Sequence, residues 1–406
     1  LKMTIKSNFS NLTREAPDPI VETMTMYAQD TSPDKIDVSI GVYKGEKGES
    51  YVFPAVSKAK KHLFENDPGH SYTNMAGIPE YTSGARKVVF GEKYGTEGKI
   101  ASLQTISGTG ACHMAFLLLR EAGLTNFYVG TPCWSNYGPM ITHVGSKYST
   151  YTHYDESLRG IDFDAVLEAL QNAPSKSVFL FQACCHNPTG ADFSKDQWKQ
   201  IASIVKSRDI FPVFDIAYQG FSSGDKDVDA WPVRYFYEQN LEFLVCQSFS
   251  KNMGLYSERA GCLHAVVQDT DYVPNVQSQL VALFRSECSF APAYGARIAS
   301  IIINEPGLEN QWGQEVSDVT TRLKNIRKQI LDKFLELGTP GKWDHVVKQQ
   351  GLFWYSGLSP EQNDKLIEDH HIYSTSIGRV NIAGLNESSV DKFVGAIDKV
   401  VRDSIG

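Results

Sequence analysis

Short apolar runs alternate with helical patterns between roughly residues 100 and 270. Four of the runs have the length of a strand, at residues 126–130, 178–181, 211–214 and 243–246. Ser194 followed by Gln197 forms a capping box, which predicts a crossover helix through Lys206. Because parallel strands must be joined by such crossovers, the alternation predicts βα units stacked into a mostly parallel sheet.

The pattern changes after Glu305. Apolar residues recur at three- and four-residue steps from Val316 to Leu337, which predicts a long amphipathic helix that stops at the Gly-Thr-Pro of residues 338–340. A smaller α+β segment follows, closed by a helical run from about Val390 to Val401. The predicted fold class is therefore α/β, a large domain with a mostly parallel sheet flanked by helices plus a smaller α+β domain.

Composition and charge narrow the class of partner. The chain has 406 residues, of which 42% are hydrophobic, enough to bury the cores of two domains. A formal net charge of −8, without a stripe dense in Lys and Arg, argues against nucleic acid and anionic membranes as partners. Small molecules are the expected partners.

Cysteine usage and hydropathy indicate the compartment. The seven cysteines include no CxxC pair and are scattered through predicted strands and helices, so we expect reduced, buried thiols without a disulfide framework or a metal site. No apolar stretch approaches the roughly 20 residues that cross a bilayer, and the start of the chain lacks a secretory pattern. The sequence predicts a cytoplasmic protein.

Polar clusters follow three of the predicted strands. They are the Asn-Pro-Thr-Gly of residues 187–190, the Asp-Ile-Ala-Tyr of residues 215–218, and the Ser-Phe-Ser-Lys-Asn of residues 248–252. The carboxyl ends of successive strands are where an open α/β sheet places its ligand crevice. Lys251 at such an end, with hydroxyls beside it and Arg259 eight residues later, is typical of a pyridoxal phosphate site. Alone, this motif also fits an ordinary surface lysine.

These clusters together resemble the aspartate aminotransferase family, the aspartate and aromatic branch of the fold-type I enzymes that use pyridoxal phosphate. The resemblance covers nearly the whole chain. It is carried by the segments Ala-Pro-Asp-Pro at 16–19, Ile-Gly-Val-Tyr at 40–43, Ser-Gly-Thr-Gly at 107–110, and residues 186–190, 215–220, 248–259 and 378–381. Their order and spacing make coincidence an unsatisfactory explanation.

The resemblance implies a domain division and a homodimer. The large domain that binds pyridoxal phosphate would span residues 50–315. The small domain would combine residues 16–49 with 316–406, and residues 1–15 would form an N-terminal arm. Tyr72 matches the family tyrosine that reaches the phosphate bound in the neighbouring subunit. The functional unit would then be a homodimer whose active sites are shared across the interface.

The resemblance also assigns the catalytic and ring-binding residues. Lys251 would react with the cofactor's aldehyde and then act as the acid and base that moves a proton. Asp215 would pair with the pyridine nitrogen, although an aspartate that caps a turn fits the same position. Tyr218 and Asn187 would donate hydrogen bonds to the phenolic oxygen of the ring. Trp134 would stack on the ring, whereas alone it fits a core tryptophan.

The phosphate site would be formed by two segments. Ser107, Gly108 and Thr109 open a predicted helix through Leu119, where free N–H groups and the helix dipole favour an anion. Ser248 and Arg259 would complete the site. Gly108-Thr109-Gly110 does not extend to the dinucleotide GxGxxG pattern, so a nicotinamide dehydrogenase is a poor alternative.

Two arginines would select the substrate. Arg379 matches the residue that forms a bidentate pair with the α-carboxylate, assisted by Asn187, Trp134 and the backbone near Gly41. Arg285 aligns with the arginine that reaches across the dimer to the distal carboxylate of aspartate or glutamate. The resemblance thus implies an aspartate:2-oxoglutarate aminotransferase that works in two half-reactions, producing oxaloacetate and L-glutamate.

Three residues depart from the family pattern. Gln182 and Tyr137 stand where histidines commonly support the pyridine-binding aspartate, and Phe290 replaces a polar residue after Ser289. Such changes around a ligand residue alter how firmly it is held. The extra aromatic near Arg285 leaves open an aromatic or broad-specificity aminotransferase.

Two further alternatives differ in chemistry. A pyridoxal-phosphate lyase or decarboxylase would share Lys251, Asp215 and Arg379 and differ in its products. A binding or scaffold protein without catalysis would take up no pyridoxal phosphate.

Overall fold

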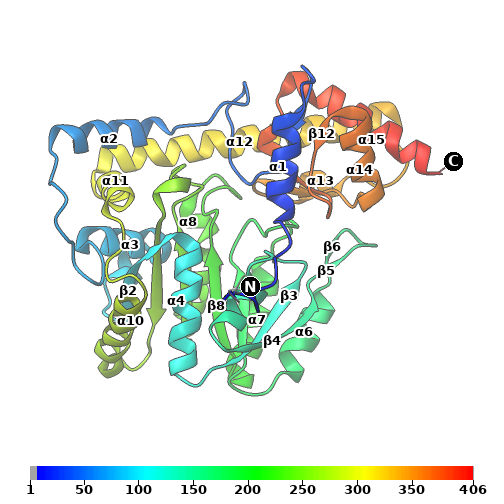
Figure 1. Ribbon diagram of the computed structural model, residues 1–406. Coiled ribbons are helices and arrows are strands. Elements are labelled where there is room, and N and C mark those ends of the chain that lie inside the picture. The colour runs from blue at the N-terminus through cyan, green and yellow to red at the C-terminus, as the bar shows by residue number, and fades with distance from the viewer. Residues whose placement is uncertain (1–6, 406) are drawn as a thin grey trace, which may run out of the picture.

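The computed structural model describes residues 7–405, and a seven-stranded sheet forms its centre (Figure 1). The strand order is β2-β10-β9-β8-β7-β3-β4. β10 runs antiparallel to β2 and β9, and every other pair in the sheet is parallel. The bounds are β2 (Ile100–Ile106), β3 (Asn126–Thr131), β4 (Lys147–Thr152), β7 (Val178–Gln182), β8 (Phe211–Ile216), β9 (Phe243–Ser248) and β10 (Ala260–Val266). The four predicted strands are β3, β7, β8 and β9, each one or two residues longer than expected, so the α/β fold class with a mostly parallel sheet is confirmed.

Both faces of the sheet are buried along its central strands, whereas the edge strand β4 is mostly exposed. Along β7, Val178 and Leu180 join the core beneath α4 and α10, whereas Phe179 and Phe181 join the core beneath α7. This alternation is the two-residue period of a strand, and helices on both faces are why the run is apolar throughout. The helices of this layered part are α2 (Pro54–Glu65), α3 (Pro79–Gly95), α4 (Ser107–Glu121), α5 (Tyr137–His143), α6 (Phe163–Asn172), α7 (Lys195–Arg208), α8 (Lys226–Asp229), α9 (Trp231–Glu238), α10 (Val273–Glu287) and α11 (Ala293–Asn304).

The predicted helix ends are present in the structure. Ser194 caps α7 in a complete capping box with Gln197, and the helix continues two residues past Lys206. The long helix is α12 (Pro306–Leu337), and its 32 residues span about 48 Å. Its C-cap is Gly338, which has a left-handed backbone with a φ of 59°. Residues with a side chain rarely adopt this conformation, so a glycine suits the position.

A second group of elements surrounds the carboxyl-terminal half of α12 (Figure 1). Here a segment from the N-terminal part of the chain pairs with one from the C-terminal part. β1 lies parallel to β12, and Asn381 N–H donates to Val38 C=O. The predicted terminal helix is α15, which extends three residues before Val390 and four beyond Val401. The elements are α1 (Pro19–Gln29), β1 (Ile36–Asp37), α13 (His345–Lys348), β11 (Phe353–Tyr355), α14 (Pro360–His370), β12 (Ile372–Tyr373), β13 (Arg379–Asn381) and α15 (Glu387–Ile405).

The division into residues 50–315 and residues 16–49 with 316–406 stays a prediction. The predicted arm of residues 1–15 lies partly outside the described residues. Outside these two groups are the hairpin of β5 (Tyr154–Asp155) with β6 (Gly160–Ile161) and the 3-10 turns Tyr256–Glu258, Thr270–Tyr272 and Ile382–Gly384.

The structure also bears on the expected burial of the cysteines and on the expected lack of a membrane-spanning segment. All seven cysteines are free thiols, and five are buried, while Cys133 is partly buried. Cys288 is exposed, because it lies just past the end of α10; the expectation of burial is wrong for this residue. Across residues 7–405, no helix has both the length and the apolar character that a membrane crossing requires.

Arg327 holds the second group of elements together from inside. This side chain on α12 is only 2% exposed and donates to the carbonyls of Val346, Gly351 and Phe353. Burial lowers its pKa to about 10, and the three carbonyl oxygens satisfy the guanidinium. Phe353 in turn lies beneath Arg379, with its ring centre 4.2 Å from the guanidinium carbon. Arg327 therefore helps to hold the segment whose Phe353 ring contacts Arg379.

We predict that Arg327→Met lowers the free energy of unfolding by about 2–5 kcal/mol, because three buried carbonyls lose their donor. Chemical denaturation with urea measures the change. Lys328→Met is the matched control, since Lys328 is exposed and its one ion pair among residues 7–405 is with Asp332. Its effect should stay within about 0.5 kcal/mol. Equal losses in the two variants would contradict a special contribution from Arg327.

Candidate functional site

The carboxyl ends of β7, β8 and β9 meet at one cavity of about 110 Å³. The parallel register places Gln182 opposite Asp215, and Asp215 opposite Cys246. Polar groups that follow these strands therefore converge. The lining comprises Ser107, Gly108, Thr109, Trp134, Tyr137, Gln182, Asn187, Asp215, Ala217, Tyr218, Ser248, Ser250, Lys251 and Arg259. Every residue predicted to bind the cofactor except Tyr72 is in this set.

Lys251 lies in a setting that favours its neutral amine. Its Nζ is 5.1 Å from the centre of the Tyr218 ring. Burial lowers the pKa of Lys251, with Arg259 and Arg379 acting in the same direction and Asp215 opposing them. A lysine with a lowered pKa has more of the free amine that attacks a carbonyl.

Asp215 faces the same cavity from the end of β8. Burial raises the pKa of its carboxyl to about 6, while the Tyr137 hydrogen bond and the charge of Lys251 pull it down. Tyr137 Oη donates to Asp215 Oδ2 at 2.5 Å. The carboxylate is thus held at one oxygen and lies close enough to Lys251 for their charges to interact.

The N-terminus of α4 forms an anion cradle. Ser107 and Arg259 both have left-handed backbones, with φ of 61° and 55°, and Ser107 N–H donates to Arg259 C=O at 2.9 Å. Such conformations cost about 1–3 kcal/mol each and persist where the surroundings impose them. Gly261 allows this close approach, since a Cβ there would lie 2.4 Å from the carbonyl carbon of Ser107.

Hydroxyl groups complete this cradle. Ser107 Oγ lies 2.9 Å from Ser250 Oγ, and Ser250 N–H donates to Ser248 Oγ at 3.1 Å. Ser250 is a site residue that sequence reasoning did not single out, although its position directly before Lys251 was a signal that could have found it.

The donors present fit pyridoxal phosphate. A phosphate would meet the free N–H groups of α4, the Ser107 and Ser248 hydroxyls and the Arg259 guanidinium. Trp134 and Asp215 would hold the ring, and Lys251 lines the same cavity. The cavity therefore offers the anion site, the amine and the carboxylate that this cofactor requires.

Arg379 is aimed at the same region from β13. Its Nη1 donates to Asn187 Oδ1 at 3.1 Å and its Nη2 donates to Ser39 C=O at 2.9 Å. The Nε atom is buried and has no partner among residues 7–405. A carboxylate ligand would satisfy this donor. Gly41 lies close by, since a Cβ there would be 2.9 Å from the Phe353 ring that underlies Arg379.

Tyr72 and Arg285 are not brought to this cavity. Tyr72 is 87% exposed and stacks on Phe290, with ring centres 4.8 Å apart. Arg285 is exposed near the end of α10. Tyr72 and Phe290 line a separate groove together with Phe64 and Tyr294. Within one chain, the two residues expected to serve a neighbouring subunit therefore lie on an open surface.

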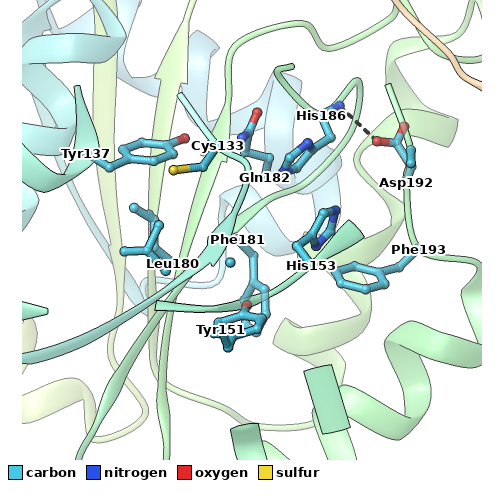
Figure 2. Close-up of a pocket in the computed structure, with 13 residues that line it drawn as sticks. Cys133, Tyr137, Tyr151, His153, Leu180, Phe181, Gln182, His186, Asp192 and Phe193 are labelled. Atoms are coloured by element: carbon cyan, nitrogen blue, oxygen red, sulfur yellow. Dashed lines mark hydrogen bonds between the residues drawn. The ribbon is translucent and has the colours of Figure 1, made fainter. Parts of the chain in front are cut away.

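A second cavity of about 20 Å³ adjoins the first and shares Tyr137 and Gln182 with it (Figure 2). It has room for about one water molecule, too little for a substrate. The rings of His153 and His186 stack at 4.2 Å, and burial lowers the pKa of His153 to about 4. Asp192 accepts from the backbone N–H of His186 at 3.0 Å. This cavity backs the loop that carries Asn187.

Gln182 is a further residue whose contacts sequence reasoning missed. Its Oε1 accepts from Asn187 N–H at 2.8 Å and its Nε2 donates to Asn187 C=O at 3.0 Å. Both ends of the amide are therefore used to hold Asn187. The sequence showed that Gln182 replaces a histidine common in the family, but it did not show that Gln182 binds the backbone of Asn187.

The sequence pattern that defines the family described as aminotransferase class I and II matches residues 33–397. The chain is 38% identical to the cytoplasmic aspartate aminotransferase of Schizosaccharomyces pombe, with 97% of this chain and 98% of that one covered. The solved cytoplasmic aspartate aminotransferase of Saccharomyces cerevisiae superposes with a TM-score of 0.94 at 37% identity, over 98% of this chain and 99% of that one. The broad-specificity aminotransferase of Leishmania mexicana superposes with a TM-score of 0.94 at 37% identity, over 97% and 98%. This chain belongs to the class I and II aminotransferases.

Proposed function

We propose that the chain is a pyridoxal-phosphate-dependent aspartate aminotransferase. It transfers the amino group of L-aspartate to 2-oxoglutarate and produces oxaloacetate and L-glutamate in two half-reactions. The proposal rests on the convergence of Lys251, Asp215 and the N-terminus of α4 in one cavity. Asn187, which also lines this cavity, accepts a hydrogen bond from Arg379. The similarity to aspartate aminotransferases over nearly the whole chain supports the choice of substrates.

Lys251 is the acid and base of the reaction. Bound pyridoxal phosphate supplies an aldehyde that takes up the amino group and a ring that accepts electrons when the substrate's α-proton leaves. The lowered pKa of Lys251 favours the free amine, which removes that proton and later returns one. Lys251 lines the cavity, with its Nζ 5.1 Å from the centre of the Tyr218 ring, so the proposal assigns both proton transfers to this one amine.

Asp215 and Tyr218 orient and tune the ring. Asp215 keeps the pyridine nitrogen protonated, because a carboxylate beside it favours the charged form. Burial raises the pKa of Tyr218, so its hydroxyl keeps its proton and can donate to the phenolic oxygen. Asn187 donates to the same oxygen through its amide nitrogen, since its Oδ1 is bound to Arg379.

Arg379 binds the α-carboxylate shared by all the substrates. Its free Nε and one edge of the guanidinium form a bidentate pair, while Asn187 and Ser39 hold the other edge. The ring of Phe353 beneath it keeps the plane of the guanidinium fixed. This residue sets which bond of the substrate stands next to Lys251.

The active enzyme is a homodimer in this proposal. Tyr72 and Arg285 both lie on an open surface, away from the cavity of their own chain. Their proposed ligands are the phosphate and the distal carboxylate in the site of the neighbouring subunit. The proposal also includes the division into domains and a cytoplasmic location, which free thiols favour.

A broad-specificity aminotransferase is the second candidate. Phe290 follows Arg285 by five residues and stacks on Tyr72. If this aromatic pair borders the side-chain pocket of the neighbouring site, it favours aromatic amino acids as additional donors.

We predict that L-aspartate alone converts the cofactor of the reconstituted protein to its amino form. Absorption spectra recorded before and after the addition, with oxaloacetate measured in parallel, test this half-reaction. One oxaloacetate should appear for each cofactor converted. A spectrum that changes with L-phenylalanine but not with L-aspartate would favour the second candidate, and release of carbon dioxide would indicate a decarboxylase.

We predict that Lys251→Ala lowers turnover by at least about 10³-fold, because the acid and base is removed. Cofactor binding should remain measurable by absorbance, since Arg259 and the α4 cradle are unchanged. Lys199→Ala, a change on the exposed face of α7, is the control and should retain full activity. Normal turnover of the Lys251 variant would refute the assigned role.

We predict that Arg285→Leu lowers kcat/KM for aspartate by about 30- to 5000-fold, the range for losing one partner of a desolvated ion pair. The value for phenylalanine should change less than about threefold, because this substrate lacks the distal carboxylate. Arg120→Leu, on α4, serves as the control for loss of a surface arginine. Equal losses for aspartate and phenylalanine would mean that Arg285 does not bind the distal carboxylate.

A further inference from the structure

The contact between Tyr137 and Asp215 is the feature of this site that the proposed mechanism does not use. The two side chains are 2% and 8% exposed, and Tyr137 Oη donates to Asp215 Oδ2 at 2.5 Å. Within residues 7–405, no other side chain donates a hydrogen bond to this carboxylate. A buried carboxylate with a single donor depends strongly on it, since an unsatisfied buried oxygen is costly.

The other polar neighbour is already engaged. Gln182 stands opposite Asp215 in the parallel register. Both ends of its amide are instead bound to the backbone of Asn187, at 2.8 and 3.0 Å. Gln182 therefore holds the loop, and Tyr137 alone holds the carboxylate.

Tyr137 is itself fixed in place. It begins α5, its N–H donates to Trp134 C=O at 3.2 Å, and the Trp134 ring packs edge-on against its ring at 5.3 Å. Burial and the nearby charge of Asp215 raise the pKa of Tyr137 well above its usual value. The phenol thus keeps its proton and acts as a neutral donor in one orientation.

We propose that Tyr137 is a positioning residue, which binds Oδ2 of Asp215 so that Oδ1 faces the pyridine nitrogen of pyridoxal phosphate. This inference rests on the proposed function, because it requires the ring to lie against Asp215. A carboxylate held at one oxygen cannot rotate away, and the donated proton stabilises its negative charge. Without the hydroxyl, both the orientation and the charge of Asp215 are less well maintained.

A ligand pair separates this role from a general effect on packing. The apoprotein is titrated with pyridoxal phosphate and with the analogue in which a C–H group replaces the ring nitrogen. The ratio of the two dissociation constants measures the recognition of the ring nitrogen. We expect Tyr137→Phe to reduce this preference about tenfold to a hundredfold, the range for a hydrogen bond to a charged group. Its affinity for the analogue should stay within about threefold of the parent value.

Two variants complete the test. Tyr81→Phe removes a hydroxyl of equal burial, whose partner is the Gly261 carbonyl at 2.9 Å, and should leave the preference unchanged. Tyr137→His supplies another neutral donor from a shorter side chain and should restore part of the preference. The histidine variant also keeps the test valid if the phenylalanine variant does not fold.

The outcomes distinguish this inference from the proposed function. If the parent protein prefers pyridoxal phosphate and Tyr137→Phe keeps that preference, the positioning role is wrong and the proposed function stands. Equal weakening for both ligands would show a packing role and would also overturn the inference. If the parent protein binds neither ligand, the proposed function and the inference both fail.

Discussion

The parallel register of β7, β8 and β9 is the constraint on which the site depends. It sets Gln182 beside Asp215 and brings the end of β9, with Lys251 just beyond it, to the same edge. Backbone hydrogen bonds within the sheet hold these strand ends rigidly, while the side chains beyond them are free to face a ligand. The two cores that cover the faces of the sheet exclude water from below this edge.

Burial at this edge gives ordinary side chains unusual proton affinities. The same loss of solvent lowers the pKa of Lys251 and raises that of Asp215 to about 6, because it disfavours both charged forms. The interaction between the two charges opposes these shifts. The site therefore pairs a lysine whose pKa is lowered with a carboxylate whose pKa is raised, and the Tyr137 hydrogen bond favours the charged form of that carboxylate.

Segments far apart in the chain meet around Arg379. The guanidinium binds Ser39 near the start of the chain and Asn187 in the loop after β7, and it rests on Phe353. Arg327 fixes the Phe353 carbonyl from α12. The proposed substrate-carboxylate site thus depends on the contact between the sheet and the elements around the end of α12. In this proposal, recognition of the substrate is linked to the packing of both groups of elements.

Local patterns in the sequence determined four of the seven strands of the central sheet, the α7 capping box and the glycine that ends α12. Each of these depends on residues only a few positions apart. The polar groups after each strand also indicated the cavity, since strand ends in a parallel sheet converge. The Tyr137 to Asp215 hydrogen bond joins residues 78 positions apart, and sequence spacing does not encode such a contact. The engagement of Gln182 with Asn187 and the exposure of Tyr72 and Arg285 were likewise decided by tertiary structure, because side-chain direction and solvent access arise only when separate elements pack together.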